Sequence, residues 1–381
     1  MPRVVVVGGG IAGTMAAVAA ARAGADVTAL VRAPGATALY SGGMNLVGDL
    51  DQLFASQPHH PFVRLGGDAL DVATQLDEAV AVFSSLIGKA GLPIQGARGR
   101  NGRFADVMGQ IRLADLVPST VMAGDLGRLR RRRLGVLGVA GVGDYSAQAT
   151  AAALSAQGVQ SVAIEVVVEG LRPGASLIDL FRRPAPQLPV GIADIWAYPP
   201  GFENLPATAC ELLSHSCPVH GWRLNAALES ICAAAGVHRI RDEVLGFRTR
   251  GARLEAAVTQ AREVAADSFV LATGRYIGGG LVKSRTVTEP LLNLPVMYEG
   301  RRVDARRSLG FRQNERISPN PAFSTGLMVD KGLRPVDDQG RVVHPNLLAA
   351  GAILGGYDYG AAEGFGVPLL TGWLAGSRAA A

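Results

Sequence analysis

A run of glycines near the start of the sequence constrains the fold more than any other feature. Residues 4–7 are four valines, and they are followed by Gly8-Gly9-Gly10-Ile11-Ala12-Gly13. Four consecutive β-branched residues predict a strand buried on both faces, as in a parallel sheet. The alanine-rich residues 11–23 predict a helix, Gly24 its end, and residues 26–31 a second strand. The glycines therefore lie between a strand and a helix in a βαβ unit.

The spacing of these glycines matches the G-x-G-x-x-G loop that binds dinucleotides. In that loop the first glycine permits a tight turn, the second lets a pyrophosphate approach the backbone, and the third lets the helix pack closely on the strand. The helix N-terminus adds free N–H groups and the positive end of its dipole. The candidate phosphate-binding residues are Gly8, Gly10, Ile11, Ala12 and Gly13. A glycine-rich turn that binds nothing is the alternative.

The composition excludes several classes of protein. Charged residues make up 18% and hydrophobic residues 48% of the 381 residues, which excludes a disordered chain. A net charge of +5 does not predict nucleic-acid binding. The three cysteines, Cys210, Cys217 and Cys232, are too few for a four-cysteine iron–sulfur cluster and show no metal-site spacing. They fit a reducing compartment, so we expect a cytoplasmic protein, although the uncharged residues 4–21 have the outline of a signal peptide.

Three later segments indicate that the ligand is a flavin. Ser41-Gly42-Gly43-Met44 follows the second strand, where flavoproteins pass a small-residue loop along the isoalloxazine edge. Residues 268–272 predict a buried strand, and Ala272-Thr273-Gly274 resembles a signature of glutathione-reductase-like flavoproteins. Gly351 and Gly364-Phe365-Gly366 resemble their C-terminal segment, which brings N–H groups and a helix N-terminus to the flavin. Three unrelated glycine turns are the alternative, but the order of the segments is far more specific than any one alone.

These elements predict the fold class and the domains. We expect an α/β protein with a Rossmann-like, glutathione-reductase-type flavin-binding domain and an inserted α/β domain. Residues 134–139, 146–157 and 161–168 predict a second strand–helix–strand unit. The flavin-binding domain is expected to comprise residues 1–60 and 240–381. Residues 61–239 would form the insertion, which serves a substrate or partner.

The adenosine end of the ligand lacks its usual protein partner. A carboxylate normally ends the second strand and binds the ribose hydroxyls, but here Arg32 follows Val31. Arg32 is therefore a candidate to face a phosphate or stack on adenine. Ala352 likewise stands where related flavoproteins have an acidic residue after the alanine-glycine pair. Both changes weaken the polar anchoring of FAD and leave FMN as the alternative cofactor.

The whole chain resembles the family formed by the B subunits of anaerobic, quinone-linked glycerol-3-phosphate dehydrogenase. The resemblance rests on Ser41-Gly42-Gly43-Met44-Asn45-Leu46, on residues 138–145 and 272–281, on Glu289-Pro290-Leu291 and on residues 350–358. It implies oxidation of glycerol 3-phosphate to dihydroxyacetone phosphate by a soluble flavoprotein subunit. It also implies a second flavoprotein subunit and an iron–sulfur, membrane-associated third subunit as partners, so that the chain lies at the inner face of the membrane.

Two other functions remain open at this point. One is an electron-transfer or scaffolding subunit without substrate chemistry of its own, and the other is a stand-alone flavin-dependent oxidoreductase of another small acid. No histidine stands just before Ser41, where succinate-dehydrogenase-like proteins attach the flavin, so we expect a non-covalent cofactor. The polar residues near the motifs are few, and no catalytic residue is assigned among them: Arg275, Lys283, Arg285, Asp358 and His344.

Overall fold

The computed structural model describes residues 1–381 except 130–131, 190, 216–218, 304–320 and 359–363. The chain divides into two compact units. Unit 1 comprises Met1–Thr37, Leu46–Ala90 and Ala227–Ala381, and unit 2 comprises Ala38–Asn45 and Gly91–Ala226.

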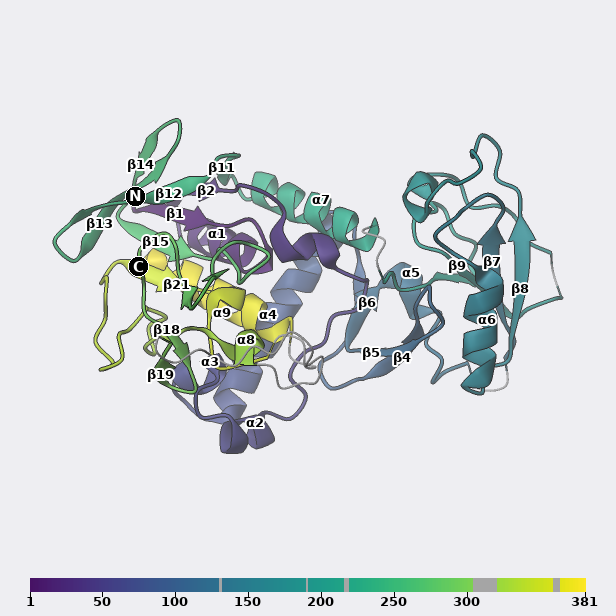
Figure 1. Ribbon diagram of the computed structural model, residues 1–381, viewed down its shortest axis with the longest axis horizontal. Helices are drawn as coiled ribbons and strands as arrows, with labels where there is room; N and C mark the ends of the chain where they lie inside the picture. Colours follow the sequence, from purple (N-terminus) through teal and green to yellow (C-terminus); the bar gives the residue numbers. More distant parts are fainter. Residues whose placement is uncertain (130–131, 190, 216–218, 304–320, 359–363) are drawn as a thin grey trace. The chain divides into compact units, whose positions relative to one another are not determined.

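The core of unit 1 is a parallel sheet with the strand order β11-β2-β1-β15-β21 (Figure 1). Its strands are β11 (His238–Ile240), β2 (Asp26–Leu30), β1 (Arg3–Val7), β15 (Ser268–Leu271) and β21 (Leu347–Ala349). The central strands β1 and β15 pair in register from Val4 with Ser268 to Val7 with Leu271. Their apolar residues are buried, as the unbroken run of valines predicts.

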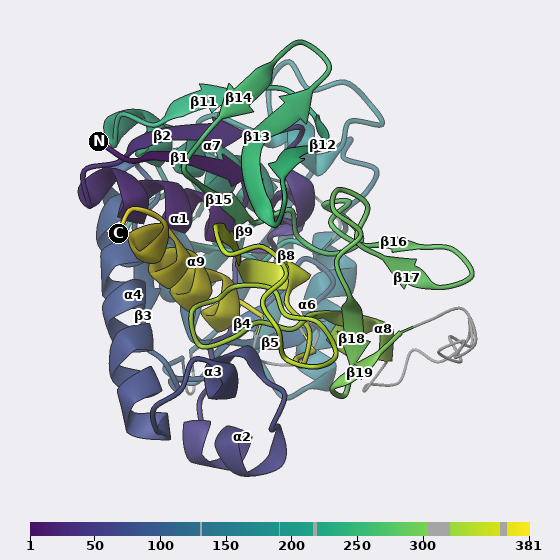
Figure 2. The same cartoon turned by 90° about the vertical axis from the view of Figure 1, so that its left-hand side faces the viewer.

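Helices α1 (Ile11–Arg22) and α9 (Gly366–Ala379) lie side by side against this sheet, and α4 (Ala69–Lys89) packs on α9 (Figure 2). The contact between α1 and α9 is unusually close. A Cβ atom added at Gly372 would meet the carbonyl oxygen of Ala12, and one at Gly376 would meet that of Ala16. Because these glycines are four residues apart, they form one stripe on α9 that fits the alanine stripe of α1.

The rest of unit 1 surrounds this layer. The antiparallel strands β12 (Val244–Arg250), β13 (Arg253–Thr259) and β14 (Glu263–Ala265) pack on the sheet through Phe247 and Phe269, whose ring centroids are 5.5 Å apart. The remaining elements of this unit are short: α2 (Leu50–Ser56), α3 (Pro61–Arg64), α8 (Pro321–Ser324), β16 (Val282–Lys283), β17 (Val287–Thr288), β18 (Val296–Tyr298), β19 (Arg301–Arg302) and β20 (Gly326–Leu327).

Unit 2 has its own parallel sheet, in the order β10-β9-β7-β8. The strands are β10 (Ala209–Glu211), β9 (Ile195–Tyr198), β7 (Leu134–Val139) and β8 (Ser161–Val166), and α6 (Ala147–Ala156) packs on β7 and β8. Gly135 leaves room for the Trp196 ring, because an added Cβ atom would overlap it. Smaller elements complete the unit: β3 (Ile94–Gly96), β4 (Gly102–Ala105), β5 (Ile111–Ala114), β6 (Leu116–Pro118) and α5 (Ser119–Met122). Helix α7 (Val219–Ala234) begins in unit 2 and ends in unit 1.

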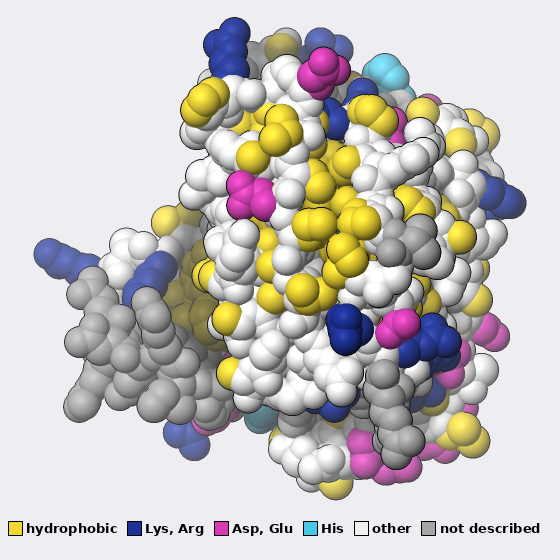
Figure 3. Space-filling model, turned by 90° about the vertical axis from the view of Figure 1, so that its right-hand side faces the viewer, with side chains coloured by type: hydrophobic (Ala, Val, Ile, Leu, Met, Phe, Trp, Pro, Cys, Tyr) yellow, Lys and Arg dark blue, Asp and Glu magenta, His cyan; other side chains and the backbone are white. Residues whose placement is uncertain are grey.

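Apolar side chains also reach the surface of unit 2. Strand β8 is an edge strand, and Ala163, Ile164 and Val166 on it are only partly buried. Val167 after the strand is exposed. Figure 3 views the protein from the side on which β8 lies and shows hydrophobic side chains gathered there between scattered charged ones.

The boundaries of the compact units differ from those expected from the sequence. Residues 61–90 lie in unit 1, because the amphipathic α4 buries Val72, Leu76 and Ala79 in the core of that unit. Residues 227–239 also lie in unit 1, since they end α7 and supply β11. Residues 38–45 lie in unit 2, where Met44 N–H donates a hydrogen bond to the Leu116 carbonyl oxygen at 2.8 Å.

The contact between α1 and α9 leads to a first prediction. Replacing glycine with alanine inside a helix ordinarily favours the helix by about 1 kcal/mol. In Gly376→Ala the added methyl group collides with the Ala16 backbone, and overpacking of this kind costs about 1–3 kcal/mol. We therefore expect a net loss in the free energy of unfolding, measured by urea denaturation. The control is Ser377→Ala, one residue further along the same helix, which should change it little. A Gly376→Ala protein as stable as the wild type would contradict this packing.

Candidate cofactor site

The carboxyl edge of the unit 1 sheet brings together most of the segments singled out in the sequence. Gly8 follows β1, Arg32 follows β2, Ala272-Thr273-Gly274 follows β15 and Gly351 follows β21. Because all of these strands are parallel, their carboxyl ends meet at one edge. Ligands of open α/β sheets bind outside this edge.

Two glycines of the first loop are required by contacts within the protein. Gly8 has a φ of 119°, and a Cβ atom there would overlap the Ala272 carbonyl oxygen. A Cβ atom at Gly13 would overlap the carbonyl oxygen of Gly8. These two glycines therefore hold the loop against β15 and against the first turn of α1.

Gly10 is different, because the space beside it is open. Among the described residues, an added Cβ atom at Gly10 would come within 4 Å only of Thr37 Oγ1, at 3.1 Å. Gly10 is the N-cap of α1 and has no side chain to cap the helix, and the first turn holds no acidic residue. The N–H groups of this turn, including those of Ile11 and Ala12, and the positive end of the helix dipole thus remain available to an anion. This arrangement fits a diphosphate.

A second polar group at this edge also fits a ligand. Thr273 Oγ1 is buried, and in the described part of the chain it has no hydrogen-bond partner. The loop after it turns back so closely that a Cβ atom at Gly278 would overlap the Thr273 carbonyl oxygen. A buried hydroxyl without a hydrogen-bond partner lowers the stability of a folded protein, and a bound polar molecule would supply the missing hydrogen bond.

The C-terminal segment reaches the same edge through helix α9. Gly351 has a φ of 77° and its N–H donates a 2.9 Å hydrogen bond to Thr371 Oγ1, which in turn donates to the Val367 carbonyl oxygen at 2.6 Å. Gly351 also lies against Ala12, since an added Cβ atom would be 2.5 Å from the Ala12 Cβ atom. Phe365 is the N-cap of α9, and Gly364 precedes it. Gly366 begins the helix, so its N-terminal turn follows the predicted flavin segment.

The segment Ser41-Gly42-Gly43-Met44 belongs to unit 2 and not to the unit that carries the other segments. Ser214 N–H donates to the Ser41 carbonyl oxygen at 2.8 Å. Gly42 has a φ of 106°, and an added Cβ atom would be 2.9 Å from the buried His220 ring. The backbone of this loop is thus fixed within unit 2, and its contact with a flavin stays a prediction.

A cluster of buried polar residues in unit 2 gave no signal in the sequence. Glu211 is buried, and both of its oxygens accept 2.8 Å hydrogen bonds from Arg223 Nη1. Thr120 Oγ1 donates to it at 2.6 Å. Burial alone would raise the pKa of Glu211, but the charged and hydrogen-bonding groups around it hold this pKa below its usual value. The Gly201 N–H also donates to this carboxylate, so Glu211 links several segments of unit 2.

Arg32 pairs with a residue that was not among the candidates. Its Nη1 donates a 2.8 Å hydrogen bond to Oε1 of Glu243, and both side chains are about half exposed. Glu243 follows β11, a strand of three residues that the sequence pattern did not predict.

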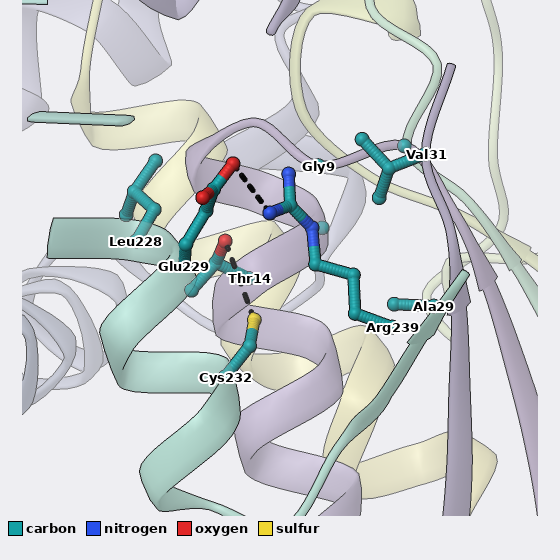
Figure 4. A pocket seen from close by; sticks show the side chains of 10 residues that line it. Gly9, Thr14, Ala29, Val31, Leu228, Glu229, Cys232 and Arg239 are labelled. Atoms are coloured by element: carbon teal, nitrogen blue, oxygen red, sulfur yellow. Dashed lines mark hydrogen bonds and ion pairs between the residues drawn. The ribbon is translucent and has the colours of Figure 1, made fainter. Parts of the chain in front are cut away.

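A cavity of about 10 Å³ lies next to the glycine loop, between α1 and α7 (Figure 4). Arg239 points there toward Glu229, and the space holds at most one water molecule.

The other polar candidates do not form a catalytic constellation. Arg275 is buried and donates hydrogen bonds to the carbonyl oxygens of Ala352 and Leu354, at 2.9 and 2.6 Å. His344 precedes β21 and donates to the Ala252 carbonyl oxygen at 2.8 Å, at the opposite edge of the sheet. Lys283 and Arg285 are exposed in the β16–β17 hairpin, and Asp358 is buried beyond Tyr357.

Comparison with known proteins identifies the cofactor. The family described as FAD binding domain matches residues 3–167. The chain is 31% identical to the probable anaerobic glycerol-3-phosphate dehydrogenase B subunit of Halobacterium salinarum over 50% of this chain and 44% of that protein. It is thus aligned to less than half of that relative. It is 27% identical to the anaerobic glycerol-3-phosphate dehydrogenase B subunit of Yersinia pseudotuberculosis over 93% of this chain and 92% of that protein.

These relatives confirm the resemblance seen in the sequence, and the domain match confirms FAD as the cofactor. The glutathione-reductase-like α/β fold is confirmed as well. Among solved structures, 3-ketosteroid delta1-dehydrogenase from Sterolibacterium denitrificans aligns over 100% of both chains with a TM-score of 0.45 and 12% identity, a likeness too weak to carry an argument.

The open space at Gly10 gives the second prediction. Gly10→Glu should abolish FAD retention in a folded protein, because it places bulk and negative charge where the diphosphate would sit. Gly10→Ala is the matched control. Its methyl group meets only Thr37 Oγ1 among the described residues, and the φ of −77° suits any residue, so it should retain most FAD. The FAD-to-protein ratio after gel filtration measures both. Normal FAD content in folded Gly10→Glu would show that the phosphate lies elsewhere.

The third prediction concerns His60, which is buried between Phe62 and Tyr357 near the C-terminal segment. Burial lowers its pKa to about 3, from about 6.5 in an unfolded chain. The folded protein therefore keeps this imidazole neutral, and the stability that depends on it is lost as pH falls from about 6.5 toward 3. We expect about 1.4 kcal/mol less unfolding free energy per pH unit in this range from His60. His60→Asn retains a cap for Phe62 N–H and should show a shallower pH slope in urea denaturation; an unchanged slope would contradict the assignment.

Proposed function

We propose that this chain, an FAD-binding flavin-dependent oxidoreductase, is the B subunit of a glycerol-3-phosphate dehydrogenase. In the proposed reaction glycerol 3-phosphate loses two electrons and two protons from its secondary alcohol and becomes dihydroxyacetone phosphate. Bound FAD would accept these electrons, which would then go to a partner subunit and to quinone. Relatives with this name that align over 93% of the chain support the proposal.

One observation carries the assignment of the chemistry. The loop at Gly8–Gly13, the Thr273 turn and Gly351 converge on one sheet edge, and the space at Gly10 is open while Gly8 and Gly13 are filled by the protein itself. The N–H groups of the first turn of α1 would bind the FAD diphosphate, and Thr273 Oγ1 would donate to a polar atom of the cofactor. When bound, FAD supplies the two-electron chemistry. We expect it to be held without a covalent bond.

A second candidate function is electron transfer or scaffolding without substrate chemistry in this chain. The positions of the polar candidates favour it. Arg275 is occupied by backbone carbonyl oxygens, and His344 lies at the far edge of the sheet. His344 therefore offers no base at the cofactor edge, and Nε and Nη2 of Arg275 are bonded to protein carbonyl oxygens. A stand-alone oxidoreductase of another small acid is the third candidate.

The relatives are named as one subunit of a larger enzyme, which implies partner subunits. We propose a second flavoprotein subunit and an iron–sulfur, membrane-associated subunit. Within the described residues, no helix is long and apolar enough to span a membrane, and no group of side chains there could hold a metal ion. Cys210 and Cys232 are buried as free thiols, and Cys217 lies outside the described residues. An attachment to the inner face of the membrane would therefore come through a partner.

The fourth prediction separates these functions. Under anaerobic conditions, glycerol 3-phosphate should bleach the FAD absorbance of the isolated chain slowly, because the described residues at the cofactor edge include no clear base. Addition of the second flavoprotein subunit should accelerate bleaching and dye-coupled turnover. Gly10→Glu in the same mixture serves as the control without FAD. Full turnover by the isolated chain would reject the need for a partner, and no bleaching even with the partner would favour a different substrate.

A further inference from the structure

The end of strand β2 has a carboxylate beside it after all, but this carboxylate comes from the neighbouring strand. Strands β2 and β11 pair in parallel up to Leu30 and Ile240, and Val31 N–H extends the pairing with a 2.9 Å hydrogen bond to the Ile240 carbonyl oxygen. The segments that follow β2 and β11 therefore leave the sheet at the same place. Arg32 lies two residues beyond β2 and Glu243 three residues beyond β11, and Arg32 Nη1 lies 2.8 Å from Glu243 Oε1.

The stability that this ion pair contributes does not explain why the two residues are placed together. Its two side chains are 53% and 46% exposed, and surface pairs of this kind add little stability. The geometry matters more. Among the described residues, only Arg32 forms a hydrogen bond or ion pair with the Glu243 carboxylate, and it does so through Oε1. Oε2 is thus left as an acceptor, while the guanidinium holds the carboxylate at the sheet edge and offsets its charge.

The surroundings of the pair match the adenosine end of the cofactor. Gly279, from the loop after β15, lies next to the tip of Arg32, since an added Cβ atom would be 3.1 Å from Nη2. The same loop turns back on Thr273, whose hydroxyl is buried at the cofactor edge. In dinucleotide-binding folds, a carboxylate at the end of the second strand binds the ribose hydroxyls. Two vicinal hydroxyls need acceptors there, and a carboxylate supplies them.

We propose that Glu243 is the ribose-binding residue of the FAD site and that Arg32 positions it. The proposal rests on FAD binding and not on the identity of the substrate. It replaces a direct contact of Arg32 with phosphate or adenine by an indirect role. Since FMN has no adenosine, the pair should select FAD over FMN.

The experiment measures binding of FAD and FMN to the whole 381-residue chain, after removal of its cofactor, by fluorescence titration. Glu243→Gln should raise the Kd for FAD about tenfold to a hundredfold, as expected for loss of a charged hydrogen bond, and leave the Kd for FMN unchanged. Arg32→Ala should produce a smaller change in the same direction. The matched control is Glu263→Gln, which breaks the Arg248–Glu263 pair, whose side chains are 52% and 48% exposed, in the β12–β14 sheet.

An FAD analogue with 2′-deoxyadenosine tests the contact itself. The wild type should bind it more weakly than FAD, and Glu243→Gln should not distinguish the two. Three results would overturn the proposal: an unchanged Kd for FAD in Glu243→Gln, an equal loss of FMN binding, which indicates a structural effect, or a loss in Arg32→Ala that exceeds the loss in Glu243→Gln, which indicates direct contact of the arginine. None of these measurements involves glycerol 3-phosphate, so failure of the proposed function leaves the test intact.

Discussion

The approach of the backbones of α1 and α9 is the interaction on which the cofactor edge depends. Gly372 and Gly376 let α9 lie on Ala12 and Ala16 with no side chain between them. This contact fixes the first turn of α1, whose N–H groups would bind the phosphate in the proposed site, and it places Gly351 against Ala12. Helices α1 and α9 lie near opposite ends of the sequence. The register in which they pack thus sets the distance between the first and the last of the predicted flavin segments. Since interiors are close-packed, a shift in this contact would be transmitted to both.

The sequence predicted the elements whose local signal is strong. The valines of β1, the alanines of α1 and the glycine spacing specify strand, helix and loop without help from the rest of the fold. The three later segments were interpreted as flavin segments from their order in the sequence. The FAD-binding assignment, which the domain match confirms, could also be predicted from local signals, because phosphate binding depends on backbone groups that glycines mark in the sequence.

The features that the sequence did not predict depend on partners distant in the chain. Strand β11 has three residues and no periodicity, so the place of Glu243 beside Arg32 follows only from sheet order. The glycines of α9 lower its intrinsic helix propensity, and only the packing against α1 explains why they are there. The expected boundaries of the insertion likewise missed α4, because its apolar stripe shows that it packs on a core but not on which one.

The order of strands in unit 1 also has a consequence for synthesis on the ribosome. Strand β1 completes its pairing only when β15, more than 250 residues later, has been made, and α1 waits for α9. At about 5–20 residues per second, the uncharged, apolar N-terminal segment remains without these partners for roughly 10–60 s. Unit 2 lies largely between these segments in the chain and can fold in the interval. During this interval the apolar surfaces of β1 and α1 stay exposed, so association with other chains competes with folding until β15 and α9 have been made.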